Sequence, residues 1–245
     1  MRLSPARTNR RRLPESQALP LDRMKNLARA AIIAELLGTA LLLATVVGSG
    51  IMAQALADGN AAIMLLANSL ATGAILVVLI LALAGESGAH FNPVVSLVFY
   101  LRKDISGSQL IYYLFAQLCG AVIGVLLAHA MFDQPLVSEY STPRTGQGQF
   151  LSELVAAFGL VAAILATLRR GVAAVAASVG LYITAAYWFT ASTSFANPAV
   201  TLARALTGSF SGIRMVDVPM FILAQLLGAM LAFYLARGFR KPGSQ

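Results

Sequence analysis

The sequence predicts an all-α membrane protein with six transmembrane helices and two short helices that enter the membrane without crossing it. Three observations support this fold class. First, 58% of the 245 residues are hydrophobic and only 11% are charged, whereas soluble domains carry roughly 25% charged residues. Second, six apolar runs come close to the about 20 residues that a membrane-spanning helix needs. Third, two short Asn-Pro segments are set between these runs.

The six apolar runs are expected to cross the membrane as helices, three in each half of the chain. The fourth and fifth are separated only by Arg169-Arg170-Gly171, so the chain has to turn back sharply there. The six runs are residues 27–52, 61–84, 108–132, 150–168, 172–191 and 216–236.

The net charge of +8 is distributed unevenly between the two sides that these spans define. Eight basic residues lie in the first 29 positions, and the pairs Arg102-Lys103 and Arg169-Arg170 fall on the same side as both chain ends. Cytoplasmic loops of membrane proteins carry such an excess of Lys and Arg. We therefore expect a multi-pass protein of the plasma (inner) membrane with both termini cytoplasmic, and the charge requires no nucleic-acid partner.

The membrane domain, about residues 27–237, contains an internal repeat. Ala34-Glu35-Leu36-Leu37 in the first run corresponds to Ser152-Glu153-Leu154-Val155 in the fourth, and residues 116–121 in the third correspond to 224–229 in the sixth. Three spans in each half give the halves opposite orientations, which makes the repeat an inverted one. Repeat 1 covers about residues 27–132 and repeat 2 about 150–237. The flanking segments, 1–26 and 238–245, are expected to be cytoplasmic tails, the first one disordered.

Each half carries an Asn-Pro segment that is expected to form half of a transmembrane helix. Asn is a strong helix N-cap and Pro is favoured at the first helical position, so helices should begin at Pro93 and Pro198. Residues 92–101 and 197–206 would each rise about 15 Å, half of the membrane thickness. Entering from opposite faces, the two helices would meet at the midplane with the positive ends of their dipoles facing each other.

This arrangement suits a pore, because irregular backbone at membrane depth is tolerated only where protein buries it or water lines it. The amides of Asn92 and Asn197 would donate hydrogen bonds to a passing oxygen. Exposed carbonyl groups of residues 88–91 and 193–196 would form a ladder of acceptors. With two histidines and one cysteine in the chain, and no nucleophile–base pair, we expect neither a metal, nor a cofactor, nor an enzyme activity.

The stretch Ser87-Gly88-Ala89-His90-Phe91-Asn92-Pro93-Val94-Val95 resembles the first signature of aquaporins and aquaglyceroporins, and Asn197-Pro198-Ala199 resembles the second. The likeness covers about residues 27–237. It implies a passive channel for water or small uncharged solutes, in a homotetramer with one pore per subunit embedded in the lipid bilayer. Beside the two asparagines, the motif residues are Pro93, Val94, Pro198 and Ala199.

The resemblance also implies roles for three other polar residues. In the family, the glutamates that match Glu35 and Glu153 support the re-entrant loops by accepting hydrogen bonds from them. An acid in the middle of a membrane span is costly and usually functional, so a proton relay remains the alternative for this pair. His90 matches the family's histidine just before the first motif, which faces the cytoplasmic pore.

One departure from the family's pattern concerns selectivity. Family members typically carry Arg directly after Asn-Pro-Ala, where it narrows the outer constriction and repels cations, but this sequence has Val200 there. Arg204 follows about one helical turn later and is not expected to occupy the same place. The family's spacing selects Thr72, Ser194 and Val200 for the constriction, with either Ala185 or Tyr187 as its fourth member.

A constriction without Arg is expected to be wider and less polar than a water-selective filter, and pore radius and lining donors decide selectivity. We therefore expect a channel for glycerol-like polyols and undissociated metalloid acids such as arsenous acid, with water passing too. The likeness is greatest to bacterial members that lack the filter Arg. A water-selective channel remains an alternative, and the inverted repeat with broken helices leaves a gradient-coupled secondary transporter as an alternative of another class.

Overall fold

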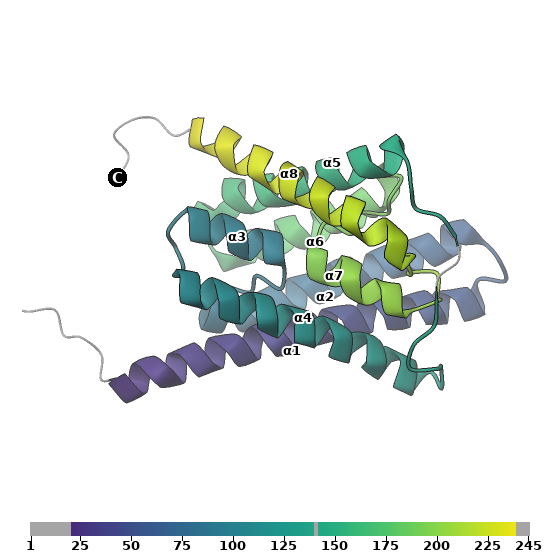
Figure 1. Cartoon of the computed structure of the whole chain (residues 1–245), viewed down its shortest axis with the longest axis horizontal. Coiled ribbons are helices and arrows are strands. Elements are labelled where there is room, and N and C mark those ends of the chain that lie inside the picture. Colours follow the sequence, from purple (N-terminus) through teal and green to yellow (C-terminus); the bar gives the residue numbers. More distant parts are fainter. Residues whose placement is uncertain (1–20, 140–141, 239–245) are drawn as a thin grey trace, which may run out of the picture.

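The computed structural model describes residues 21–139 and 142–238, and these residues form helices and connecting segments with no strand among them. Six of the helices are long and apolar enough to cross a membrane, and two short ones begin at the Asn-Pro motifs (Figure 1). The long helices are α1 (Leu21–Leu56), α2 (Ala61–Ser87), α4 (Gly107–Met131), α5 (Gln147–Thr167), α6 (Val172–Phe189) and α8 (Val218–Gly238). The short helices are α3 (Pro93–Leu101) and α7 (Pro198–Ala203), and the 3₁₀ turns are η1 (Leu168–Arg170), η2 (Arg204–Leu206) and η3 (Met215–Asp217).

The predicted all-α, six-span fold class is therefore confirmed, although most helices begin or end a few residues away from the predicted runs. Helix α1 begins at Leu21, so residues 21–26 of the predicted tail belong to a helix. Residues 1–20 and 239–245, which make up the rest of the two predicted tails, lie outside the described residues. Helix α7 is shorter than expected, because the chain tightens into the 3₁₀ turn η2 at Arg204.

Large apolar side chains cover the outside of the bundle, whereas acids and amides lie inside it. Phe115 and Leu181 are each 70% exposed, while Glu35, Gln117 and Glu153 are fully buried. Exposed apolar surface on this scale is unfavourable in water and favourable against lipid tails. The distribution of side chains thus matches a protein surrounded by lipid.

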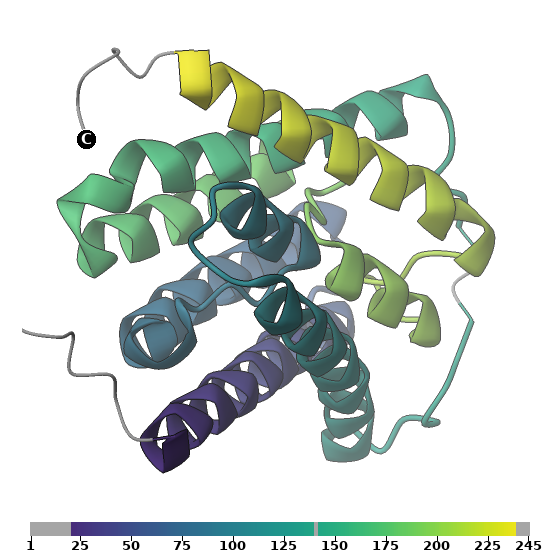
Figure 2. The same ribbon diagram turned by 60° about the vertical axis from the view of Figure 1, so that its left-hand side comes forward.

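The two halves of the chain have equivalent packing. In Figure 2, α1, α2 and α4 lie in the lower part of the bundle, and α5, α6 and α8 lie in the upper part. Helix α1 packs along α4 as α5 packs along α8, and α2 contacts α6 between the halves. Each short helix contacts both α4 and α8, so both are held between the two halves.

Two glycines at matching positions allow close contacts between these helices. A Cβ atom at Gly120 of α4 would overlap the carbonyl oxygen of Leu36 in α1, and one at Gly228 of α8 would overlap that of Leu154 in α5. These are equivalent positions of the inverted repeat. Small residues let membrane helices approach closely enough to pack backbone against backbone, which draws α4 and α8 inward beside the short helices.

The short helices begin at the centre of the molecule and run to opposite ends. Helix α3 runs toward the end where α1 begins and α8 finishes, which we call the terminal end. Helix α7 runs toward the other end, which we call the loop end and which carries residues 57–60, 132–139, 142–146 and 207–214. The N-termini of α3 and α7 therefore meet between the halves, as the sequence predicts.

Candidate pore between the half-helices

A cavity of about 270 Å³ passes between the two halves. Its wall extends from the α5–α6 connection at the terminal end, where Leu168 and Gly171 line it, to Arg204 at the loop end. Most of the wall is aliphatic, with side chains such as Leu76, Ile80 and Val179. The polar groups come mainly from the two re-entrant loops before α3 and α7.

The asparagines of the two motifs are the polar centre of this cavity. The Nδ2 atom of Asn92 donates to the carbonyl oxygen of Ala196, and Nδ2 of Asn197 donates to that of Phe91, both at 2.8 Å. Their Oδ1 atoms cap the short helices by accepting the N–H groups of Val94 and Ala199 at 3.0 Å. An amide nitrogen carries two hydrogens, so each asparagine keeps one donor beyond the bond to the other half.

The asparagine bonds change one detail of the sequence-based picture. The carbonyl groups of residues 88–91 and 193–196 were expected to form a ladder of acceptors for the solute. The last carbonyl of each ladder, from Phe91 and from Ala196, already accepts a hydrogen bond from the asparagine of the opposite half, which occupies one of its two lone pairs. These two carbonyls hold the half-helices together.

Glu35 organises the first re-entrant loop. Its Oε1 atom accepts the N–H of His90 at 2.9 Å, and its Oε2 atom accepts the N–H of Phe91 at 2.7 Å. Ser87 Oγ donates to Oε1 at 2.6 Å and Gln117 Nε2 donates to Oε2 at 2.7 Å. Four hydrogen bonds therefore satisfy a carboxylate that is fully buried.

Glu153 does the same for the second loop. Its two oxygens accept the N–H groups of Phe195 and Ala196, both at 2.9 Å, and Gln225 Nε2 donates to Oε2 at 2.6 Å. Relative to the asparagines, these are the same two loop positions that Glu35 holds. A buried glutamate, a glutamine that donates to it and two loop N–H groups thus occur once in each half.

The glutamines in these networks lie at matching positions of the repeat, within residues 116–121 and 224–229. Gln117 Nε2 also donates to Ser96 Oγ at 2.9 Å, and Gln225 Nε2 donates to Thr201 Oγ1 at 2.8 Å. Each glutamine therefore links a glutamate to its short helix. The signal that could have found them is a polar amide at the same position of both repeats inside an apolar run.

The loops need this support because their backbone is strained. Ala89 and Phe91 have φ values of 52° and 48°, and Ser194 and Ala196 have values of 49° and 50°. A residue other than glycine in this left-handed region costs of order 1–3 kcal/mol. The carboxylate hydrogen bonds offset this cost and hold the loops at the cavity wall.

The predicted constriction residues can be placed on this wall. Thr72, Tyr187, Ser194 and Val200 all line the cavity. Ala185 does not, because its side chain is exposed on the outer surface of α6. Thr72 Oγ1 and Tyr187 Oη form a hydrogen bond at 3.2 Å, whereas Ser194 Oγ is buried with no hydrogen-bond partner among the described residues. Of the two candidates on α6, only Tyr187 faces the pore.

The sequence matches the family model of the major intrinsic proteins over residues 22–173 and 168–245. The chain belongs to the major intrinsic protein family. It is 58% identical over 210 residues to the aquaglyceroporin AqpS of Rhizobium meliloti (strain 1021), which covers 86% of this chain and 90% of the relative. It is also 32% identical over 189 residues to the aquaporin NIP2-3 of Zea mays, covering 74% of this chain and 62% of that protein.

The fold of this major intrinsic protein is also that of a solved relative. The crystallographic aquaglyceroporin structure from Plasmodium falciparum superimposes with a TM-score of 0.71 and covers 85% of this chain and 95% of the other. The sequences are 22% identical, so this comparison concerns the fold alone. It supports the arrangement of six spans and two half-helices described above.

Arg204 also lines the cavity, and its side chain is 1% exposed. The expectation was only that it would not take the place of a residue at position 200. It follows Val200 by four residues, at the point where α7 ends at Ala203 and the turn η2 begins. The loop end of the pore in this major intrinsic protein therefore contains a cation that does not follow the Asn-Pro-Ala motif directly.

His90 lies in the cavity wall on the terminal side of Asn92. Its Nδ1 atom lies 3.0 Å from Ser96 Oγ, and its ring packs against Phe99 with the centroids 4.5 Å apart. These contacts fix the imidazole at the pore rather than in a cluster of ligands. Within the part of the chain that the structure describes, no group of three His, Cys, Asp or Glu side chains is arranged to hold a metal ion.

Proposed function

We propose that this protein is a passive channel for small uncharged solutes, namely glycerol-like polyols and undissociated metalloid acids such as arsenous acid, and that water passes as well. The observation that carries the proposal is the cavity with two asparagine donors at the meeting point of the half-helices. A solute hydroxyl in this cavity finds donors on one side and aliphatic wall elsewhere, which suits a neutral molecule with a polar and an apolar face. The relative that is 58% identical is named an aquaglyceroporin, which favours this function over a water-selective channel.

The site residues then have the following roles. Asn92 and Asn197 donate to the solute oxygen at the centre, while Pro93, Val94, Pro198 and Ala199 start the helices that position them. Thr72, Tyr187, Ser194 and Val200 form the selectivity filter, in which Ser194 Oγ supplies a hydrogen-bonding group and Val200 supplies apolar wall. Glu35 and Glu153 support the loops. His90 lines the cytoplasmic half of the pore.

The same proposal covers the protein's surroundings. The chain is a multi-pass protein of the plasma membrane with the terminal end in the cytoplasm, and it assembles as a homotetramer. The excess of Lys and Arg at the terminal end supports the orientation. Labelling of single cysteines introduced at Asp58 and Lys103 of a Cys119→Ser protein, from outside intact cells, tests the orientation. Native mass spectrometry in detergent tests the tetramer.

Stopped-flow light scattering on proteoliposomes tests the function, with water, glycerol and arsenous acid compared in the same preparation. We expect glycerol and arsenous acid fluxes above those of empty vesicles, increasing almost linearly with concentration and with a low activation energy. Flux of water alone would support the water-selective alternative. Flux that saturates at low concentration, or that follows a proton or sodium gradient, would support the secondary transporter and refute the proposal.

A further inference from the structure

Two guanidinium groups lie against the ring of Phe195, the residue two places before Asn197. The Cζ atom of Arg204 lies 3.4 Å from the ring centroid, and that of Arg144 lies 5.3 Å from it. Both distances fall within the about 6 Å over which an aromatic face attracts a cation. Phe195 and Arg204 both line the cavity, so positive charge is concentrated at the loop end of the pore.

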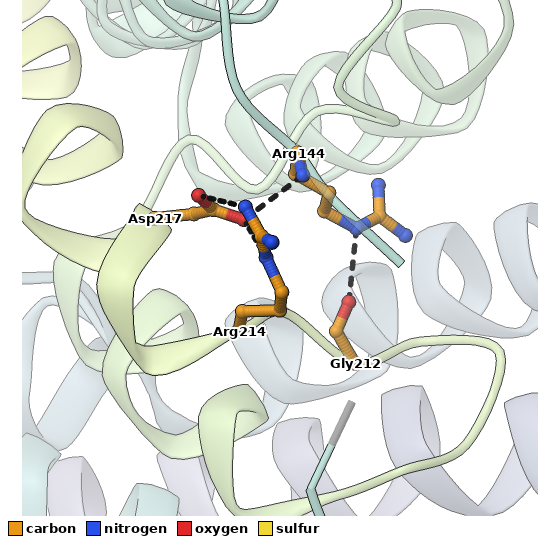
Figure 3. Close-up of polar contacts among 4 residues, drawn as sticks. All are labelled: Arg144, Gly212, Arg214 and Asp217. Carbon is orange, nitrogen blue, oxygen red and sulfur yellow. Dashed lines mark hydrogen bonds and ion pairs between the residues drawn. The ribbon is translucent and has the colours of Figure 1, made fainter. Parts of the chain in front are cut away.

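Arg144 reaches this position from the connection between α4 and α5, and the segment before α8 holds it there (Figure 3). Its Nε atom donates to the carbonyl oxygen of Gly212, and its backbone N–H donates to Oδ2 of Asp217, both at 2.9 Å. Asp217 also accepts two hydrogen bonds of 2.9 Å from Arg214. These bonds raise the pKa of Arg214 above its ordinary value, so Arg214 stays charged and balances the carboxylate.

Arg204 is fixed by the neighbouring residue of the same segment. Its Nε atom donates to the carbonyl oxygen of Ser211, which precedes Gly212 in the chain. A carbonyl oxygen carries no formal charge, so this bond directs the guanidinium without cancelling its charge. Because the side chain is 1% exposed, its field is screened less than that of a surface arginine and extends into the cavity.

We propose that Arg204 supplies the positive charge that keeps inorganic cations out of this pore, in place of an arginine at position 200. Arg144 and Asp217 are positioning residues, which hold Phe195 and residues 211–212 against Arg204. This inference rests on the proposed channel function, and it explains how a filter without the usual arginine still rejects Na⁺ and K⁺. The width of the pore and its positive charge are then set by different residues, since Val200 leaves room for the solute while Arg204 carries the charge.

The test measures Na⁺ influx into proteoliposomes with an enclosed Na⁺-sensitive dye, and glycerol flux in the same vesicles. Wild-type vesicles are expected to pass glycerol and to stay as tight to Na⁺ as empty vesicles. Arg204→Met should raise Na⁺ influx at least about tenfold while glycerol flux remains, and Arg204→Lys, which keeps the charge, should not. Arg237→Met is the matched control, because it removes the same charge from an exposed site near the end of α8.

A second variant tests the proposed exchange of positions. Adding Val200→Arg to Arg204→Met is expected to abolish the Na⁺ leak and to lower glycerol flux, because the positive charge of the pore is restored while the pore becomes narrower at position 200. An Arg204→Met protein that passes glycerol and remains tight to Na⁺ overturns the inference. If that variant does not reconstitute, Arg204→Gln keeps a donor for the Ser211 carbonyl and is judged by the same two fluxes.

The positioning residues are tested through their dependence on Arg204. Asp217→Asn is expected to raise Na⁺ influx in the wild-type background and to add nothing in the Arg204→Met background. Equal increases in both backgrounds would show that Asp217 acts on stability alone and would overturn its positioning role. Absence of glycerol flux in wild-type vesicles would refute the proposed function instead, so the two failures are distinguishable.

Discussion

Replacing Glu153 by Ala is expected to destabilise the folded channel without changing which solutes it passes. The carboxylate accepts the N–H groups of Phe195 and Ala196, and both groups lose their hydrogen-bond acceptor when it is removed. A buried donor left without a partner costs about 1–3 kcal/mol, so two of them cost about 2–6 kcal/mol. Gln225 keeps its bond to Thr201 and adds little to this cost.

The structure also predicts how related variants rank by their loss of stability. Glu35→Ala should cost more than Glu153→Ala, because Ser87 loses its bond to Glu35 as well, whereas Gln117 and Gln225 are affected alike. Glu153→Gln should cost about half as much as Glu153→Ala, since its amide oxygen still accepts one backbone N–H while its nitrogen faces the other. Glu86→Ala is the control, because it removes an exposed carboxylate at the end of α2.

Heating the detergent-solubilised proteins and measuring the fraction that remains monodisperse by size-exclusion chromatography gives the order of stability. Proton flux of the reconstituted variants is measured alongside. Glu153→Ala protein as heat-resistant as wild type would refute the hydrogen-bond reasoning. Normal stability combined with altered proton flux would favour a proton relay over loop support.

Three further changes test other parts of the structure. Val200→Arg is expected to reduce glycerol and arsenous acid flux more than water flux, and an equal reduction of all three would contradict the filter assignment. Tyr187→Ala should increase glycerol flux, because a smaller side chain widens the pore at this position. Ala185→Val, on the outer surface of α6, should leave glycerol flux unchanged in the same assay. Gly228→Ala should cost about 1–3 kcal/mol, seen as earlier loss of monodisperse protein on heating, because its Cβ overlaps Leu154; Gly85→Ala, which meets open space, should not.

Much of the fold and the centre of the candidate site could be predicted from the sequence because their causes are local. Apolar runs fix the spans, and Asn followed by Pro fixes where a helix starts, whatever surrounds it. Asn92 and Asn197 cap the two short helices as predicted. The repeat of Glu35 at Glu153 indicated equivalent halves, and equivalent hydrogen bonds join both carboxylates to their loops.

The outer constriction could not be predicted in the same way, because it depends on contacts between distant segments. Whether Ala185 or Tyr187 faces the cavity depends on where α6 ends and the loop before α7 begins. The number of residues between them and Asn197 does not determine this point. That Arg204 lines the cavity was not predicted, since the contacts that hold its side chain come from the carbonyl of Ser211 and the ring of Phe195.

The paired bonds between each asparagine and the opposite loop also bear on how the protein is made. Until the second half has entered the membrane, Asn92 has no Ala196 carbonyl to bind and the Phe91 carbonyl has no Asn197. Polar groups without partners are costly at that depth, so the first re-entrant loop cannot reach its final form before the second one is in place. Biogenesis is therefore expected to include a step in which both re-entrant loops fold together, after residue 197 has left the ribosome.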